Sequence, residues 1–399
     1  MKCTVEKHIN VLDGIRAAAI LFVVWFHFWQ QSWLTPYITI EGNLARYLGI
    51  SQINLAGFAR YGFVFVDLLI LLSAVCNFFP YARAILLGEP WPDMKEFYLK
   101  RIIRIFPSYF LSVFTMLIIA IIEKSYTDAG FMWKDIITHL TFTSIFSSDT
   151  LTGTRLNGVL WTVQLEVIYY ILLPWIALLF KKRPALTLTG MWVCGIVSAN
   201  YFVIQKSDNI SVYVNHILTF AGCYANGILI CMLYITLKKN RAENRYTQMA
   251  STAVAVFCVI AFNHLLKHFT DGNLQEIQLK NRFAFAAVFA CFVLAVMFSM
   301  EGFQWLFANK IMRFISVISY NLYIWHQVIA VKCKEYRIPY WEGEDAPNIT
   351  GDRVWQWKYQ ILIIVLSLLA AIVLTYCFEI PVAGFFRGKL KSQKNTKGS

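Results

Sequence analysis

The chain has 399 residues, of which 58% are hydrophobic and only 15% are charged, and its mean hydropathy is +0.54. Soluble domains carry about 25% charged residues, so this composition excludes an ordinary soluble protein. Aromatic residues make up 16% of the chain, which suits two belts of aromatic side chains at the membrane interfaces. The composition therefore indicates an integral membrane protein.

Apolar stretches long enough to cross a bilayer recur along the chain. A spanning helix needs roughly 17–25 such residues, and ten stretches have this length: 11–31, 62–81, 103–122, 158–180, 185–204, 212–236, 248–266, 283–300, 312–331 and 359–381. A shorter stretch rich in Thr and Ser, 134–148, is expected to be a re-entrant or interfacial segment. The pattern predicts an all-α polytopic bundle of about ten transmembrane helices within residues 1–386, followed by a basic tail at 387–399.

Basic residues are concentrated on one side of the predicted membrane. With ten spans both termini lie on the same side. Most of the 36 Lys and Arg residues fall in the tails and loops of that side, and most of the 23 acidic residues fall opposite. Cytoplasmic loops carry such an excess of Lys and Arg, so both termini are predicted to be cytoplasmic. Topology then explains the net charge of +13, and we expect no nucleic-acid partner.

The cysteine and histidine spacings do not indicate a metal site or a disulfide. No CxxC pair or Cys/His ligand spacing occurs among the 9 cysteines and 7 histidines. His264 and His268 have the spacing of a helical metal-binding pair but lack a third ligand. We therefore expect no metal and no bound cofactor.

The first span carries ionisable residues where the bilayer makes them costly. Arg16 and His27 are eleven residues apart, about three full helical turns, so they share one face and lie about 16 Å apart along the axis. Ionisable groups inside spans usually mark functional sites. His27 is a candidate general base, and Arg16 is a candidate clamp for an anionic substrate. The alternative is that His27 only forms a hydrogen bond to another helix.

Two further spans carry charged side chains in their first half. Arg101 and Arg104 lie one turn apart at the start of the third span, where a pair of guanidinium groups suits phosphate binding. Ordinary anchoring at the cytoplasmic interface is the alternative for this pair. Glu166 lies several residues inside the fourth span and is a candidate to orient His27 or to balance its charge.

The ninth span has a polar and aromatic face that lipid contact does not explain. Ser319, Tyr320 and Tyr323 lie on it and are expected to line the acceptor side of a site. His326 follows within one turn as a second candidate for acid–base chemistry or for substrate contact. A purely structural role for His326 is the alternative.

Five motifs occur in a fixed order along nearly the whole chain, from about residue 9 to about residue 386. They are Leu12-Asp-Gly-Ile-Arg16 with His27, Arg101-x-x-Arg104, Leu160-Trp-Thr-Val-Gln-Leu-Glu166, Ile318-Ser-Tyr-Asn-Leu-Tyr-Ile-Trp-His326 and Glu379-Ile-Pro381. In this order they resemble the motifs of membrane acyltransferase family 3, the bacterial O-acyltransferases that modify cell-surface glycans.

The resemblance implies an activity and a location. In that family a cytoplasmic acyl-CoA donates an acyl group, usually acetyl, to a sugar or related acceptor beyond the cytoplasmic face. The resemblance implies that His27 is catalytic and that Arg16, Arg101 and Arg104 bind the acyl-CoA or build the structure around the site. The chain is therefore expected to be an O-acyltransferase of the bacterial cytoplasmic membrane. Its partners would be the bilayer, acyl-CoA as co-substrate, and a glycan or lipid-linked sugar as acceptor.

The chain departs from the family pattern in its second span. Where the family often has two aromatic residues before Leu-Ser-Gly-Phe, this sequence reads Leu69-Ile-Leu-Leu-Ser-Ala-Val75. The difference leaves the acyl chain and the acceptor open. Some relatives carry an additional extracytoplasmic hydrolase-like domain, which is not expected here. Direct transfer, or transfer completed by a separate partner, is expected in its place.

Other functions remain open at this point. A transporter or flippase for a lipid-linked saccharide also needs intramembrane charges, although such proteins often contain inverted repeats and none is visible here. A different membrane O-acyltransferase fold acting on lipid is a second alternative, and a module that keeps the fold without the chemistry is a third. The sequence leaves open the oligomeric state, a homo-oligomer included, and whether a covalent acyl-histidine forms.

Overall fold

The computed structural model describes residues 9–35, 37–39, 52–205, 210–240, 244–267 and 274–396. Within these ranges, ten helical segments are long and apolar enough to cross a membrane, and each overlaps one predicted stretch. The segments are α1 (Asn10–Ser32), η1 (Gly62–Val64) with α4 (Phe65–Leu87), α5 (Met94–Ile122), η3 (Gly158–Leu160) with α8 (Trp161–Lys182), α9 (Pro184–Gln205), α10 (Ile210–Val214) and η4 (Ile217–Phe220) with α11 (Ala221–Lys239), α12 (Arg245–Leu266), α13 (Leu274–Phe298), α14 (Glu301–Ala308) with α15 (Lys310–Glu335), and α17 (Arg353–Leu374) with α18 (Ile380–Thr396). The prediction of a polytopic helical bundle is confirmed.

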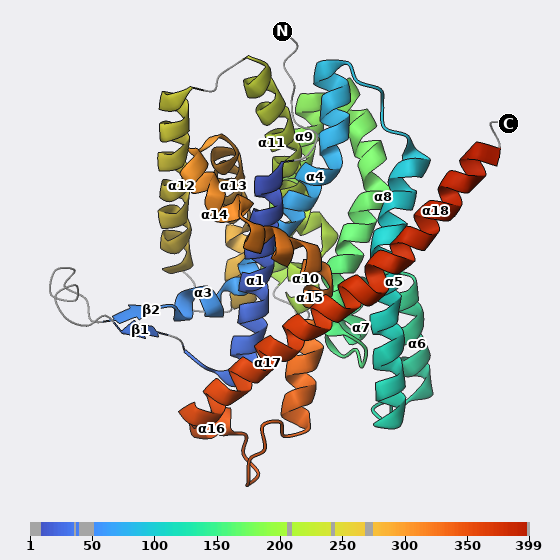
Figure 1. The fold of residues 1–399 in the computed structure, drawn as a ribbon, viewed down its shortest axis with the longest axis vertical. Helices are drawn as coiled ribbons and strands as arrows, with labels where there is room; N and C mark the ends of the chain where they lie inside the picture. Colours follow the sequence, from blue (N-terminus) through green and yellow to red (C-terminus); the bar gives the residue numbers. More distant parts are fainter. Residues whose placement is uncertain are drawn as a thin grey trace.

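The shorter elements lie between these spans. A two-stranded antiparallel ribbon of β1 (Tyr37–Thr39) and β2 (Gln52–Asn54) pairs Ile38 with Ile53, and the short α3 (Ala56–Arg60) follows it. The short α16 (Pro347–Thr350) precedes the last span. In Figure 1 the ribbon projects to one side of the bundle. The start of α1 and the end of α18 lie at the same end of the bundle, the upper end of that view.

Close backbone contacts hold the central helices together. A Cβ atom at Gly14 of α1 would lie 1.7 Å from the carbonyl oxygen of Phe307 in α14, so only glycine permits this approach. Gly227 of α11 allows a similar approach to α4, because a Cβ there would lie 2.5 Å from the Cβ of Ala74. Gly14 stands two residues before Arg16, so its contact fixes the part of α1 that carries this arginine.

The last span contains a π-helical turn between α17 and α18. This turn, Thr375–Glu379, lies within one long helix that crosses the bundle obliquely in Figure 1. Asn321 of α15 donates hydrogen bonds from its amide to Thr375 Oγ1 (3.0 Å) and to Glu379 Oε2 (2.7 Å). The turn thus links the final span to the helix that carries His326. Turns of this kind occur mostly at functional sites.

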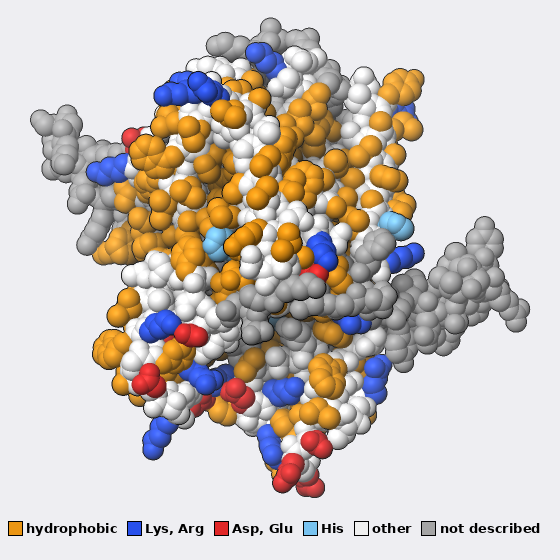
Figure 2. Space-filling view, turned by 180° about the vertical axis from the view of Figure 1, so that it is seen from behind, with side chains coloured by type: hydrophobic (Ala, Val, Ile, Leu, Met, Phe, Trp, Pro, Cys, Tyr) orange, Lys and Arg blue, Asp and Glu red, His pale blue; other side chains and the backbone are white. Residues whose placement is uncertain are grey.

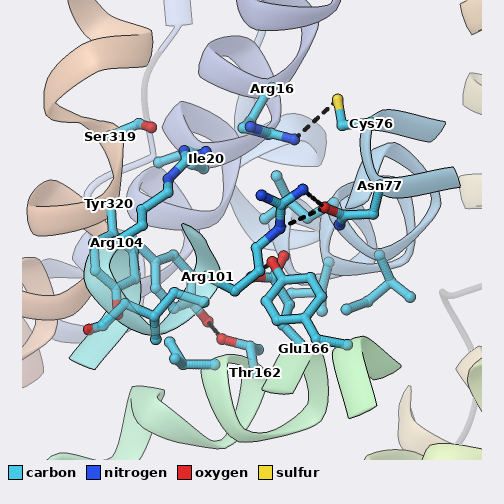
Figure 3. Close-up of a pocket in the computed structure, with 17 residues that line it drawn as sticks. Arg16, Ile20, Cys76, Asn77, Arg101, Arg104, Thr162, Glu166, Ser319 and Tyr320 are labelled. Carbon is cyan, nitrogen blue, oxygen red and sulfur yellow. Dashed lines mark hydrogen bonds between the residues drawn. The ribbon is translucent and has the colours of Figure 1, made fainter. Parts of the chain in front are cut away.

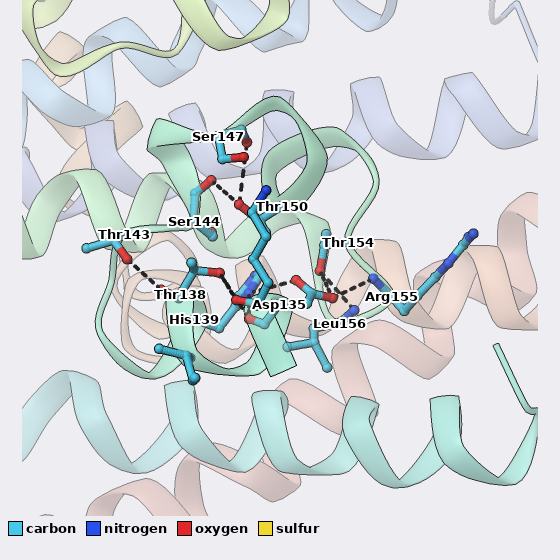
Figure 4. A network of polar contacts seen from close by, with 12 residues as sticks. Asp135, Thr138, His139, Thr143, Ser144, Ser147, Thr150, Thr154, Arg155 and Leu156 are labelled. Atoms are coloured by element: carbon cyan, nitrogen blue, oxygen red, sulfur yellow. Dashed lines mark hydrogen bonds and ion pairs between the residues drawn. The ribbon is translucent and has the colours of Figure 1, made fainter. Parts of the chain in front are cut away.

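The predicted re-entrant or interfacial segment forms short helices: α6 (Ala129–Leu140), η2 (Ser144–Phe146) and α7 (Ser148–Thr152). Figure 4 shows the polar network that ties α6 to the following loop. Oδ2 of Asp135 accepts hydrogen bonds from the Thr154 hydroxyl and the Arg155 backbone N–H, each 3.0 Å long. Burial would raise the pKa of Asp135, but the neighbouring His139 and the hydrogen bonds from the Arg155 backbone and the Tyr126 hydroxyl hold it below its usual value.

The outer surface is suited to lipid. Figure 2 shows apolar side chains over much of the upper and middle part of the molecule, Lys and Arg side chains at the upper end, and both acidic and basic side chains toward the lower end. Ile122 and Ile204, for example, each expose 74% of their surface. A soluble monomer rarely exposes so much contiguous apolar surface, whereas a bilayer covers it. The protein is therefore a multi-pass membrane protein.

We predict that Gly14→Ala destabilises the fold, because the added methyl group meets backbone that cannot move aside. Overpacking of this kind costs about 1–3 kcal/mol, so thermal unfolding in detergent should show a lower midpoint. Gly302→Ala is the matched control, since a Cβ atom there meets nothing within 4 Å. A Gly14→Ala midpoint equal to that of wild type would contradict the proposed close contact.

Candidate functional site

A cavity lined by three arginines lies between α1, α4, α5, α8 and α15. It encloses about 880 Å³. Figure 3 shows the side chains that line it, with the guanidinium groups supplied by α1 and α5. We call it the arginine cavity, and its polar lining consists of Arg16, Cys76, Asn77, Arg101, Arg104, Thr162, Glu166, Tyr170, Ser319, Tyr320 and Tyr323.

Neutral side chains hold two of these arginines in place. Arg16 donates a hydrogen bond to Cys76 Sγ (3.3 Å), and Arg101 donates through Nε to Asn77 Oδ1 (2.8 Å). The Asn77 amide in turn donates to the backbone carbonyl of Ser73 (2.6 Å). A thiol and an amide position the guanidinium groups without neutralising their charge. The cavity is therefore suited to an anionic ligand such as a phosphate group.

Glu166 is the carboxylate in the lining of the arginine cavity. Its Oε2 accepts a hydrogen bond from the Tyr170 hydroxyl (3.0 Å), one turn further along α8. The sequence-based prediction placed Glu166 beside His27. The structure places it among the arginines, and no hydrogen bond joins it to His27 within the described residues. This position favours an electrostatic partnership with Arg16, because the two side chains line the same cavity.

His27 forms a hydrogen bond with His326. Its Nδ1 lies 2.9 Å from His326 Nε2, and the ring centroids are 4.9 Å apart. The other nitrogen of His326, Nδ1, faces the backbone carbonyl oxygens of Leu322 (3.1 Å) and Tyr323 (2.7 Å). Carbonyl oxygens can only accept hydrogen bonds, so this Nδ1 carries the proton.

The protonation of His326 determines that of His27 in the neutral pair. With its proton on Nδ1, His326 can only accept at Nε2, so His27 must donate from Nδ1. The Nε2 atom of His27 is then unprotonated, and its lone pair is available as a base or a nucleophile. His326 is fully buried and does not line the cavity described next, so its contact with His27 orients that side chain from the interior of the bundle.

His27 lines a second cavity of about 1080 Å³, which we call the histidine cavity. Its other polar lining residues are Gln30, Trp161, Asn215, Gln275, Gln278 and Tyr323. Val66 and Tyr323 line both cavities, so these side chains form a wall common to the two spaces. The Tyr323 hydroxyl accepts a hydrogen bond from Thr162 Oγ1 (2.8 Å), which leaves its own proton free to donate.

The structure brings most of the predicted site residues together, but in two groups. Arg16, Arg101, Arg104 and Glu166 line the arginine cavity with Ser319, Tyr320 and Tyr323, while His27 and His326 form a pair. The sequence-based prediction placed Ser319 and Tyr320 on the acceptor side. The structure places both in the arginine cavity, where the Tyr320 hydroxyl donates to the backbone carbonyl of Ile105 (2.9 Å). Among the predicted site residues, Tyr323 alone lines both cavities.

Several important polar residues were missed by the analysis of the sequence. Asn77 lies inside the second span, where a lone amide in an apolar helix was the available signal. Arg282 lies one residue before the predicted eighth span. Its Nε atom forms an ion pair with Oδ1 of Asp67, at a distance of 3.2 Å. Its Nη1 also donates to the Val214 carbonyl (2.7 Å) and to Thr219 (2.6 Å). This buried pair connects α13 to α4. Of the two histidines with metal-binding spacing, His264 is described and His268 lies outside the described residues.

Comparison with known proteins places these features in a family. The family model described as "Acyltransferase domain" matches residues 9–380. A putative acetyltransferase of Acidianus two-tailed virus is 25% identical over 239 residues, 59% of this chain and 65% of the viral protein. A peptidoglycan O-acetyltransferase of Listeria monocytogenes is 22% identical over 349 residues, 81% of this chain and 50% of that protein.

A putative peptidoglycan O-acetyltransferase of Bacillus subtilis is also similar. It is 22% identical over 353 residues, 82% of this chain and 49% of that protein. The chain thus spans about half the length of these two bacterial relatives. No solved structure matches. Because the family model covers nearly the whole chain, the protein belongs to the acyltransferase-domain family, the membrane acyltransferase family 3 that its motifs resemble.

Proposed function

We propose that this protein is a membrane O-acyltransferase. It moves an acyl group, expected to be acetyl, from cytoplasmic acyl-CoA to a hydroxyl of an extracytoplasmic or membrane-associated glycan. Family membership and the names of the relatives support acyl transfer. The observation that supports it most is that the two cavities are adjacent: a space lined by three arginines shares Val66 and Tyr323 with a space lined by His27, whose Nε2 lone pair is available.

The arginine cavity is the proposed site of the acyl-CoA. Coenzyme A carries several phosphate charges at neutral pH, and guanidinium groups bind phosphate oxygens through paired hydrogen bonds. Arg16 lies near the start of α1, on the side of the bundle where the excess of Lys and Arg predicts the cytoplasm. The donor therefore reaches Arg16, Arg101 and Arg104 from the cytoplasmic side, and its thioester points toward Tyr323.

His27 is the proposed catalytic residue. Its Nε2 removes the proton of the acceptor hydroxyl, and the oxygen attacks the thioester carbonyl. The carbon–sulfur bond then breaks, the proton passes to the leaving thiolate, and the products are free CoA and an ester. The phenolic proton of Tyr323 is available to stabilise the oxyanion that forms. The same lone pair of His27 would also serve a route through a covalent acyl-histidine.

We predict that His27→Ala abolishes acyl transfer. Membranes with matched amounts of wild-type or variant protein would receive radiolabelled acetyl-CoA, and alkali-labile label in the glycan fraction would be counted. Loss of a catalytic base lowers the rate by about 10²–10⁴-fold. His264→Ala is the control, because His264 is exposed at the far end of α12. Equal label from wild type and His27→Ala would exclude His27 from the mechanism.

We predict that His326→Ala acts through His27. It should lower kcat while leaving the KM for acetyl-CoA nearly unchanged, because the donor binds at the arginines and the variant disturbs only the orientation of the base. His326→Gln can still accept the hydrogen bond from His27 Nδ1, so it should recover part of the lost kcat. If His326→Ala and His326→Gln lose the same activity, a tautomer-fixing role for His326 is refuted.

We predict that Arg101→Gln raises the KM for acetyl-CoA about tenfold to a hundredfold, since a hydrogen bond to a charged group contributes about 1.5–3 kcal/mol. With acetyl-pantetheine, which lacks the nucleotide phosphates, the substitution should change little. Lys182→Gln, at the exposed end of α8, is the matched loss of a positive charge. An equal loss with both donors would show that Arg101 does not bind the nucleotide phosphates.

A further inference from the structure

We propose that the histidine cavity binds an uncharged saccharide, and that it selects against acceptors carrying a carboxylate or phosphate near the reacting hydroxyl. This inference rests on the proposed function and specifies the class of its acceptor. The residues that carry it are the amide and aromatic side chains of the cavity wall.

Three of the described amide side chains that line the cavity, those of Gln30, Asn215 and Gln278, have hydrogen-bonding capacity to spare. Gln278 of α13 is only 8% exposed, yet its amide makes no hydrogen bond within the described residues. Gln30 and Asn215 line the same space, and no hydrogen bond from their side chains occurs within these residues either. Amide groups that face a cavity and have no protein partner are available to a ligand, and they suit one with both donors and acceptors. Sugar hydroxyl groups are both, and an amide can bind one with its oxygen and another with its nitrogen.

Aromatic rings supply the remaining surface that a sugar needs. Trp161 stands at the start of α8 and lines the cavity, and its indole N–H makes no hydrogen bond within the described part of the chain. Phe26 and Phe63 pack edge to face, with ring centroids 5.1 Å apart, and also line the space. Sugar rings present apolar C–H faces between their hydroxyl groups. Aromatic faces beside amide groups therefore match a saccharide better than a purely apolar or purely ionic ligand.

The proposed selection against anionic acceptors follows from the lack of charged side chains among the described residues that line the histidine cavity. No Lys, Arg, Asp or Glu is among the residues that line the histidine cavity, whereas three arginines line the arginine cavity. The nearest guanidinium along α13 is that of Arg282, one turn beyond Gln278. It does not line the cavity, and its Nε and Nη1 are engaged by Asp67, Val214 and Thr219, while its Nη2 has no hydrogen-bond partner among the described residues. An anionic acceptor would lose its hydration shell here without gaining a cationic partner. A neutral sugar avoids that cost.

The test compares two acceptors of the same size. Purified full-length protein would receive radiolabelled acetyl-CoA with saturating methyl glucoside or methyl glucuronide, which differ only at C6, a hydroxymethyl group in one and a carboxylate in the other. Only ester on the secondary hydroxyl groups that both sugars share would be compared. Labelled ester and released CoA would both be measured. We expect at least tenfold more ester on the glucoside. Equal or greater labelling of the glucuronide would overturn the proposal, as would labelling of neither sugar by protein that acetylates the glycan of its own membranes.

A change of charge in the wall provides a second, independent test. Gln278→Lys should lower the preference for the glucoside at least tenfold by giving the carboxylate a partner, and Asn215→Lys is a parallel variant if the first does not fold. An unchanged preference in a folded variant, judged by its thermal midpoint, would overturn the proposal.

A different result would refute the proposed acyltransferase function itself. That result is the absence of any His27-dependent CoA release with either sugar or with membrane glycan, so the two failures are distinguishable.

Discussion

The hydrogen bond between His27 and His326 is the interaction on which the proposed chemistry of the site depends. Backbone carbonyl oxygens fix the proton of His326 on Nδ1, and the remaining nitrogen then orients His27. Because His326 is fully buried, water does not compete for the hydrogen bonds of its Nδ1, and the protein sets its tautomer. The close contact at Gly14 and the link from Asn321 to the π-helical turn hold α1 and α15 in the positions that this bond requires.

The two cavities differ in charge in a way that suits two different substrates. Arg16, Arg101 and Arg104 concentrate positive charge in one, and amide and aromatic groups make the other neutral. Tyr323 lines both, so under the proposed function it would stand between a donor held by the arginines and an acceptor held near His27. This division also explains why buried charge is tolerated in α1 and α5, since positive groups inside a membrane are retained where a ligand or an internal partner compensates them.

Much of this arrangement could be predicted from local sequence pattern. Span length and hydropathy locate all ten helices, and helical periodicity places Arg16 and His27 on one face of α1. The contacts between helices could not be predicted in this way. His27 and His326 are 299 residues apart, and nothing in either span specifies which partner the imidazole finds. Glu166 was the plausible choice from its chemistry, yet the packing of α8 turns it toward the arginines. That Gln278 is largely buried and its amide has no partner among the described residues could be learned only from the structure.

The most direct test of the account is the protonation state of His27 itself. Protein labelled with nitrogen-15 in its histidine side chains would be studied by NMR, and the signals of His27 and His326 assigned by their loss in the alanine variants. The account predicts a proton on Nδ1 and a bare Nε2 for both residues near neutral pH. A proton on His27 Nε2 would contradict it, because the nitrogen proposed to act on the acceptor would then have no lone pair to offer.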